Sequence, residues 1–499
     1  MAKDLSALVI GLDIGTTSTI GILVAPPDRI VAVASRPTTL SSPHPGWAEE
    51  DPAEWWANSC AVLRELMTHA APEKLAGICV TGMVPAFVAL DTTGQLLRPS
   101  IQQSDGRSAA EVAELQAEVD EAAFLRRTGN GINQQLIAAK SRWIEKHEPE
   151  AFARIATLFG SYDFINWKLT GVRGVELNWA LEAGLIDVEH NSINDELVLF
   201  THLPRDAIPP AHAPHDKLGA VTNEAASATG LPAGLPVFGG AADHIASALA
   251  AGIVEPGDVL LKFGGAGDII MAASAARPDA RLFLDYHIVP GLFAPNGCMA
   301  ASGSALNWLA ALLSPDVNGR PHAKLDALAA SVPAGSDGVT ALPYFLGEKT
   351  PLHDPYARGT FTGLSLGHTA GHLWRAMLEA IAYGFRHHVE VFEETGHAPK
   401  RFFASDGGSQ SQVWMQIVAD VLQAPVTVLE NAHGSSVGAA WVAAMASGTA
   451  TDWRDVSKLS RRGATLAPNP ANAAIYDRGY AEFRELYETL KPLFRKRAT

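Results

Sequence analysis

The sequence predicts an α/β protein built from two related lobes with a ligand cleft between them. A strand, a glycine-containing turn and a second strand occur near the start of the chain, at residues 7–26, and the same pattern recurs at residues 257–274. The chain has 499 residues, which is more than a single hydrophobic core usually holds. A cleft between two such lobes is a common place for a small-molecule ligand.

In the first lobe, apolar runs alternate with turns and helices. Residues 52–67 predict a helix, because a proline suits the first turn and large apolar side chains follow at helical spacing. Another helix is expected to begin at Asp243, after an apolar run that ends in Gly239 and Gly240. Further strands are predicted at three apolar runs, residues 29–35, 74–82 and 86–91.

The second lobe continues with helices after its hairpin. Residues 372–392 predict a long helix, since their apolar side chains recur on one face. A later strand ends at Asp406, where glycines lead into a helix that ends near Leu422. Glycine and proline cluster at residues 252–257, just before the second hairpin. We therefore expect the domains to be residues 1–251 and 252–499.

Composition limits the kinds of partner. The formal net charge of -15 argues against an extended nucleic-acid surface, which needs clustered lysine and arginine. No run of about 18 apolar residues occurs, so no membrane span is predicted. The three cysteines lie far apart and form no CxxC pair, which indicates neither a disulfide framework nor a zinc site. The expected compartment is a reducing cytoplasm, and the expected partner is a small molecule.

The turn at residues 13–18, Asp-Ile-Gly-Thr-Thr-Ser, has the chemistry of a phosphate site. Gly15 lets the backbone approach a ligand, and successive amides in a tight turn can hold an anion. Thr16 and Thr17 add hydroxyl groups, and Asp13 is placed to hold a cation beside the phosphates. An ordinary hairpin turn capped by an aspartate explains the same residues equally well. No GxxxxGK[ST] loop is present, and no GxGxxG opens a helix.

Two further places can carry chemistry. Asp243, at the start of a helix, can act as a general base in a cleft or can simply cap the helix, and the two roles exclude each other only partly. Gly407 and Gly408 precede a helix, where glycines permit the close approach of a flat or anionic ligand. A glycine-rich connection between a strand and a helix is also common without any ligand.

These segments occur together in an order that resembles the FGGY carbohydrate kinases, with a pattern closest to xylulokinase-like members. The opening DxGTTS turn is the first shared motif, and the resemblance covers nearly the whole chain. The other matching segments are residues 44–56 (HPGWAEEDPAEWW), 138–149 (AAKSRWIEKHEP), 344–365 (YFLGEKTPLHDPYARGTFTGLS) and 405–422 (SDGGSQSQVWMQIVADVL).

The resemblance implies two actin-like, ribonuclease H-like lobes, and an enzyme that uses ATP and Mg²⁺ to phosphorylate a hydroxyl of a sugar or related polyol. It implies that Asp243 accepts the proton of the attacking hydroxyl and that Asp13 lies at the magnesium ion. It also implies a possible homodimer. The residues implied at ATP are Gly15, Thr16, Thr17, Gly264, Gly265, Gly407, Gly408 and Ser409.

The substrate residues implied by the resemblance depart from the xylulokinase pattern. Val84 and Pro85 replace a Met-His pair, and Gln103 and Ser104 replace Trp-Asn. His244 replaces the asparagine that usually follows the catalytic aspartate, and on the second phosphate hairpin a glycine, residue 265, replaces a threonine found in many members. The residues expected to contact the sugar are Met83, Val84, Asp105, Asp243 and His244.

Several functions remain open at this point. A pentulose such as xylulose is a candidate substrate, and another ketose, a sugar alcohol or a sugar acid are alternatives. The apolar Val84–Pro85 pair leads us to expect that D-xylulose is a poor substrate beside at least one other polyhydroxy compound. The Arg-Glu pair of glycerol kinases is absent. A non-catalytic actin-like nucleotide-binding protein is a remote alternative, against which Asp243 argues.

Overall fold

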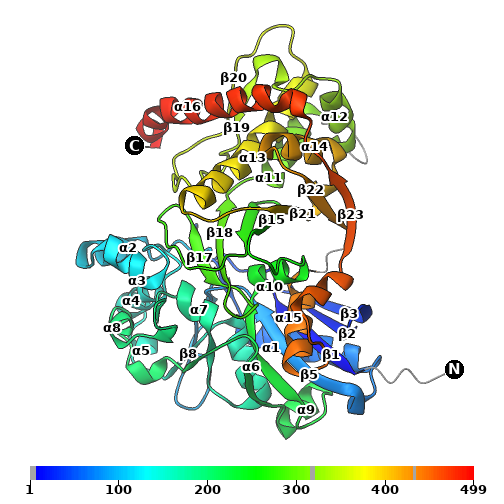
Figure 1. The fold of residues 1–499 in the computed structure, drawn as a ribbon. Helices are drawn as coiled ribbons and strands as arrows, with labels where there is room; N and C mark the ends of the chain where they lie inside the picture. The colour runs from blue at the N-terminus through cyan, green and yellow to red at the C-terminus, as the bar shows by residue number, and fades with distance from the viewer. Residues whose placement is uncertain (1–6, 315–320, 431–433, 499) are drawn as a thin grey trace, which may run out of the picture.

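The computed structural model describes residues 7–314, 321–430 and 434–498 and shows two lobes, each built around a β-sheet (Figure 1). The first sheet has the strand order β13-β14-β5-β1-β2-β3. β1 and β2 form the predicted antiparallel hairpin, and β5 and β14 extend the sheet in parallel. The strands are β1 (Leu8–Ile14), β2 (Ser18–Ala25), β3 (Arg29–Pro37), β5 (Leu75–Gly82), β13 (Lys217–Ala220) and β14 (Pro236–Ala242).

The second sheet, with the order β17-β18-β16-β15-β21-β22-β23, repeats this arrangement. β15 and β16 form the second predicted hairpin, β21 and β22 follow in parallel, and β23 closes the edge antiparallel, as β13 does in the first sheet. The prediction of two related α/β lobes is therefore confirmed. The strands are β15 (Asp258–Phe263), β16 (Gly267–Met271), β17 (Phe283–Tyr286), β18 (Phe293–Met299), β21 (Arg401–Ser405), β22 (Val426–Glu430) and β23 (Arg461–Leu466).

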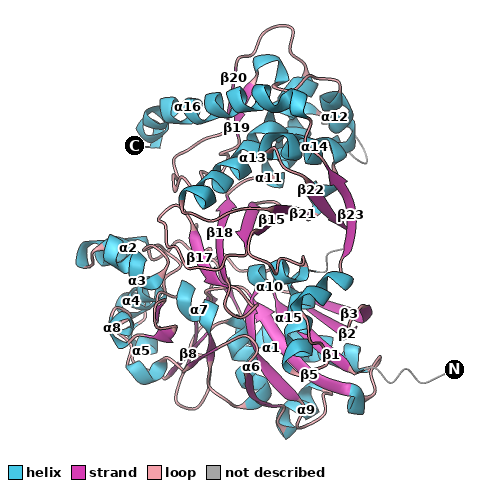
Figure 2. Cartoon of the chain, viewed as in Figure 1, coloured by secondary structure: helices cyan, strands magenta, loops and turns pink. Residues whose placement is uncertain are grey.

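Helices surround both sheets (Figure 2). Those that precede the second sheet in the chain are α1 (Pro52–Met67), α2 (Ala109–Glu118), α3 (Glu121–Thr128), α4 (Ile137–His147), α5 (Pro149–Phe152), α6 (Ser161–Thr170), α7 (Leu177–Glu182), α8 (Asp195–Leu199), α9 (Asn223–Thr229) and α10 (Asp243–Ala250). Those that follow are α11 (Gly303–Leu313), α12 (Pro321–Ala330), α13 (Ala370–Glu394), α14 (Gln412–Leu422), α15 (Gly434–Ala446) and α16 (Ala473–Ala498).

Short strand pairs lie outside the two sheets. They are β4 (Glu49–Glu50) with β7 (Ser100–Ile101), β6 (Val88–Leu90) with β8 (Thr157–Phe159), β9 (Val175–Glu176) with β12 (Ala211–His212), β10 (Ile186–Asp187) with β11 (Ser192–Ile193), and β19 (Thr340–Leu342) with β20 (Thr360–Thr362).

The predicted helices agree closely with the observed ones. α1 spans the predicted residues 52–67, because the Asp51 side chain accepts a hydrogen bond from the backbone N–H of Ala53 and Pro52 occupies the first turn. α13 contains the predicted residues 372–392. Among the residues that the structure describes, no helix combines the length and the apolar character that crossing a bilayer requires.

One helix crosses between the lobes. α15 follows the second sheet in the chain but packs against β1, β5 and α10 of the first lobe (Figure 1). α15 and α10 approach so closely that a Cβ atom on Gly438 would lie 2.0 Å from the carbonyl oxygen of Ala246. All strands of the first sheet precede residue 252 and all strands of the second follow it, while α15 joins the first lobe from the second half. The division at residues 251 and 252 stays a prediction.

Candidate active site

A polar cavity of about 550 Å³ is lined by side chains from both halves of the chain. From residues before the second hairpin it receives Asp243 and His244 at the start of α10, together with Thr16, Met83 and Val84. From the second half it receives the strand residues Lys262, Asp268, Ile270, Phe283, Asp285, Asn296, Gly297 and Cys298 and the loop residues Lys349 and His353. The other lining residues are Gln103, Ser104, Asn133, Gln134, Gln135, Glu182, Ser247 and Ser435.

Asp243 reaches this cavity from the junction of β14 and α10. Ala242 occupies the N-cap position of α10, so the alternative in which Asp243 is the N-cap residue is wrong. The Asp243 side chain is 37% exposed, and its Oδ1 accepts a 2.6 Å hydrogen bond from the backbone N–H of His244. A carboxylate with this exposure, facing a cavity, can accept a proton from a bound hydroxyl.

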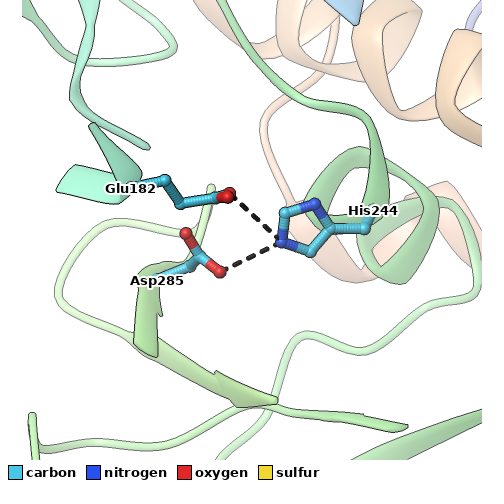
Figure 3. Close-up of side chains that lie close together, drawn as sticks. All are labelled: Glu182, His244 and Asp285. Carbon is cyan, nitrogen blue, oxygen red and sulfur yellow. Dashed lines mark hydrogen bonds and ion pairs between the residues drawn. The ribbon is translucent and has the colours of Figure 1, made fainter. Parts of the chain in front are cut away.

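His244 belongs to a cluster with two carboxylates (Figure 3). Its Nε2 lies 3.0 Å from Oδ2 of Asp285 and 3.9 Å from Oε1 of Glu182. The Asn296 amide donates a 2.8 Å hydrogen bond to the same Asp285 oxygen. These side chains come from α7, α10, β17 and β18, so the cluster connects the lobes at the cavity wall.

The charges of this cluster favour a protonated His244. Burial alone would lower the pKa of His244, but the carboxylates of Asp285, Asp243 and Glu182 raise it well above its ordinary value. Burial and the charge of Asp285 raise the pKa of Glu182 well above its own. His244, Asp285 and Glu182 bring ligand atoms within 4.8 Å of one another, but a metal ion there would have to displace the imidazole proton. The cluster therefore presents a protonated imidazole and two carboxylates at the cavity wall, groups that can form hydrogen bonds with a polar ligand.

Asp13 is the penultimate residue of β1 and does not itself line the cavity, although its hydrogen-bond partner Ser435 does. It is 8% exposed, and its Oδ2 accepts a 2.6 Å hydrogen bond from Ser435 at the start of α15. Its Oδ1 is buried and has no hydrogen-bond partner among the described residues. Burial, with a contribution from Asp243, raises the pKa of Asp13 to about 7. A buried carboxylate oxygen without a partner fits the ligand set of a hard divalent cation.

A second cavity, of about 720 Å³, lies on the other side of the second hairpin. Gly264 and Gly265 of the hairpin and Gly407 and Gly408 of the loop before α14 line it, as the sequence suggests for a nucleotide. Gly408 has a steric reason to be glycine, because a Cβ atom there would lie 2.5 Å from the ring of Trp414. The remaining wall comes mainly from the α11 and α13 regions and the start of α12.

Not every predicted site residue lines a cavity. Gly15 and Thr17 lie in the β1–β2 turn, where the Gly15 N–H donates to the carbonyl of Ser18. Ser409 is buried and donates its hydroxyl hydrogen to the carbonyl of Asp406. Thr16, Met83, Val84, Asp243 and His244 do line the first cavity. Their roles toward substrate and nucleotide stay predictions.

The structure corrects the expectation that Asp105 contacts the sugar. Its side chain is 1% exposed and does not line the cavity. One carboxylate oxygen accepts a 2.6 Å hydrogen bond from the backbone N–H of Ala48, and both oxygens bind the Arg107 guanidinium, which stacks 3.7 Å from the ring centroid of Trp47. Asp105 therefore holds the loop in place, and the neighbouring residues Gln103 and Ser104 are the ones that reach the cavity.

Several polar residues that line the first cavity were not predicted from the sequence. Glu182, Asp285 and Asn296 come from three separate segments, none of which matches a catalytic motif. Lys262 and Asp268 were visible as charged residues that interrupt the apolar strands of the second hairpin. A charge in a strand that is otherwise buried is the one signal that could have identified them.

The repeated lobes, the cavity with Asp243 and the adjoining glycine-lined cavity suit a two-lobed enzyme that brings two substrates together. Residues 8–250 match the N-terminal domain of the FGGY family of carbohydrate kinases, and residues 216–447 match its C-terminal domain. The chain belongs to this family and is an ATP-dependent carbohydrate kinase.

Individual relatives agree with this assignment. The chain is 28% identical to the xylulose kinase of Escherichia coli, over 97% of this chain and 100% of that one. It is 31% identical to the glycerol kinase of Citrifermentans bemidjiense, over 88% and 90% of the two chains. The crystal structure of xylulose kinase from Rhodospirillum rubrum superposes with a TM-score of 0.95 at 66% identity, covering 98% of this chain and 100% of that one. Xylulokinase-like members are thus similar along the whole chain.

Proposed function

We propose that this kinase transfers the γ-phosphoryl group of ATP to a hydroxyl of a ketose of about pentulose size, with Asp243 as the general base. The observation that carries the proposal is the position of Asp243 in a polar cavity that adjoins the glycine-lined cavity. Residues 262–265 connect them, because Lys262 lines the first cavity while Phe263, Gly264 and Gly265 line the second. The sugar would occupy the first cavity and ATP the second.

In this proposal, Asp243 accepts the proton of the substrate hydroxyl as its oxygen attacks the γ-phosphorus. A new oxygen–phosphorus bond forms, the bond to the β-phosphate oxygen breaks, and ADP leaves. Asp13, through its unpartnered Oδ1, would hold Mg²⁺, which neutralises charge on the phosphates when bound. Thr16 at the cavity and the backbone of the Gly264–Gly265 turn would position the phosphates.

Polar residues that line the first cavity would form the hydrogen bonds that select the substrate. Val84 presents an apolar side chain to the cavity, while the carbonyl of Pro85 accepts a hydrogen bond from the buried Lys140. That part of the wall therefore gives the sugar no donor, and the hydroxyl groups would be bound by polar side chains elsewhere in the lining, among them Gln103, His244 and Asp285. The proposed compartment is the cytoplasm, where ATP is available and the cysteines, which are free thiols, stay reduced. A homodimer stays a prediction.

The relative kcat/KM of different substrates tests this proposal. The relatives make D-xylulose the reference compound. We expect its kcat/KM to be about ten- to hundredfold below that of at least one other ketose, alditol or aldonic acid, because a hydroxyl facing Val84 has no partner. Coupled ADP release measured over such a panel, with and without each compound, checks this.

The outcomes separate two claims. D-xylulose as the best compound of the panel would show that other residues read its hydroxyls, and the kinase assignment would stand. ADP release that no polyhydroxy compound increases would contradict the proposed transfer itself. The His244→Asn variant tests the role of this cavity wall, because it removes the imidazole from Asp285 while the Asn296 amide stays. It should change the order of substrates more than the rate of ATP use without sugar.

A further inference from the structure

Lys262 is a charged residue at the junction of the two cavities. It is the penultimate residue of β15, whose sequence Asp-Val-Leu-Leu-Lys-Phe is otherwise apolar after its first residue. Its side chain lines the polar cavity together with Asp243, while the residues that follow it, Phe263 to Gly265, line the glycine-lined cavity. A phosphoryl group that passes from a nucleotide in one cavity to a hydroxyl in the other must cross this junction.

The Lys262 ammonium group pairs with Asp268 and lies in the field of the Asp406 and Asp243 carboxylates. Lys262 and Asp268 are register partners across the second hairpin, and Nζ lies 3.6 Å from Oδ2 of Asp268. That distance is longer than a normal hydrogen bond, so the pair holds the ammonium by charge without fixing its N–H groups. Burial lowers the pKa of Lys262, but Asp268, Asp406 and Asp243 together raise it above its ordinary value. Lys262 is therefore a cation, although its side chain is only 20% exposed.

Asp406, whose charge acts on Lys262, has an unfavourable backbone conformation. Its φ of 71° and ψ of -176° lie in a region that is favourable only for glycine and strained for other residues. Ser405, just before it, is the register partner of Lys262 on the neighbouring strand, and an Asp406 carboxylate oxygen lies 3.5 Å from where a Cβ atom on Gly264 would be. Strain of this kind persists where the surrounding structure holds it, often at functional sites.

We propose that Lys262 is a catalytic residue whose ammonium group contacts the transferring γ-phosphoryl group and stabilises the negative charge on its equatorial oxygens. Asp268 and Asp406 are positioning residues that hold the ammonium at the junction. Lys262 donates hydrogen bonds throughout and transfers no proton, so the bonds made and broken are those of the phosphoryl transfer alone. This inference rests on the proposed function, because it needs the sugar and ATP to meet at this junction.

Comparing the binding of an ATP analogue with the binding of ADP distinguishes a catalytic role of Lys262 from a structural one. In Lys262→Met we expect kcat to fall about 10²–10³-fold, the loss typical of removing one charge-stabilising donor, with a much smaller change in KM for the sugar. The Kd of a non-hydrolysable ATP analogue should rise about tenfold or more, while the Kd of ADP, which has no γ-phosphate, should stay nearly unchanged. Lys262→Arg should recover part of kcat, and Lys217→Met, an exposed strand lysine, is the matched control.

A second variant keeps the test valid if the single substitution perturbs folding. The double variant K262M/D268N removes both charges of the pair, and it should remain as slow as K262M. Recovery of kcat in the double variant, or equal weakening of ADP and of the ATP analogue in K262M, would show that Lys262 only balances the carboxylates, and would overturn the inference. Unchanged kcat in K262M beside an active wild type would do the same. A wild type without sugar-dependent ADP release would instead overturn the proposed function.

Discussion

Asp243→Asn is expected to remove most turnover and to leave nucleotide binding nearly intact. The amide keeps the shape of the carboxylate at the start of α10 but cannot accept the hydroxyl proton, and the loss of a general base commonly costs about 10²–10⁴-fold in rate. Asp243 does not line the glycine-lined cavity, where ATP is proposed to bind, so the Kd of ADP should change little. Steady-state kinetics on the best substrate and a direct nucleotide-binding titration measure the two quantities.

The control is Asp28→Asn, which makes the same chemical change in the exposed β2–β3 turn and should leave kcat unchanged. A variant at position 243 that kept more than half of the wild-type kcat would show that another group accepts the proton. A loss of ADP binding parallel to the loss of kcat would point to damage of the whole site. Either result would contradict the proposed role of Asp243 as the general base.

Gly438→Ala is expected to lower both stability and activity. The new Cβ atom would lie 2.0 Å from the carbonyl oxygen of Ala246, so α15 and α10 would have to move apart. Overpacking of this kind costs about 1–3 kcal/mol in the free energy of unfolding. Because α10 begins with Asp243 and His244, its displacement also moves Asp243, the proposed base, and a shift of about 1 Å can cost about 10²-fold in rate.

Gly131→Ala is the matched control, since no heavy atom outside its neighbours lies within 4 Å of a Cβ atom there. Chemical denaturation and kcat should therefore separate the two variants clearly. Equal stability of Gly438→Ala and Gly131→Ala would mean that the α10–α15 contact tolerates a methyl group. The link between this contact and the position of Asp243 would then be wrong.

The sequence predicted the parts of the fold that local patterns specify. Both hairpins show an apolar run, a glycine turn and a second apolar run, and α1 carries its own cap in Asp51. The place of α15 could not be predicted, because its segment is rich in alanine and small residues and has no polar face to show which lobe it joins. Only the packed structure brings it against the first sheet.

Some residues of the candidate site could also be predicted from local sequence patterns, and others could not. Asp13, Thr16 and Asp243 lie in motifs whose order resembles the family, so the sequence was enough to suggest their roles. The Glu182–His244–Asp285 cluster joins segments that are far apart in the chain, and no spacing rule brings them together. Asp105 was misassigned because a motif position does not reveal that Arg107 and the backbone of Ala48 already occupy its carboxylate. Long-range contacts of this kind decide which polar residues face a ligand.

Phosphorus NMR of the wild-type enzyme with Mg²⁺, ATP and the best compound of the panel tests the central claim most directly. If Asp243 and the two adjoining cavities carry out phosphoryl transfer, the γ-phosphate signal of ATP should disappear as ADP and a new phosphomonoester signal grow in equal amounts. The phosphomonoester should stop forming when the polyhydroxy compound is left out. Conversion of ATP to ADP and inorganic phosphate alone, at the same rate with and without that compound, would contradict the account.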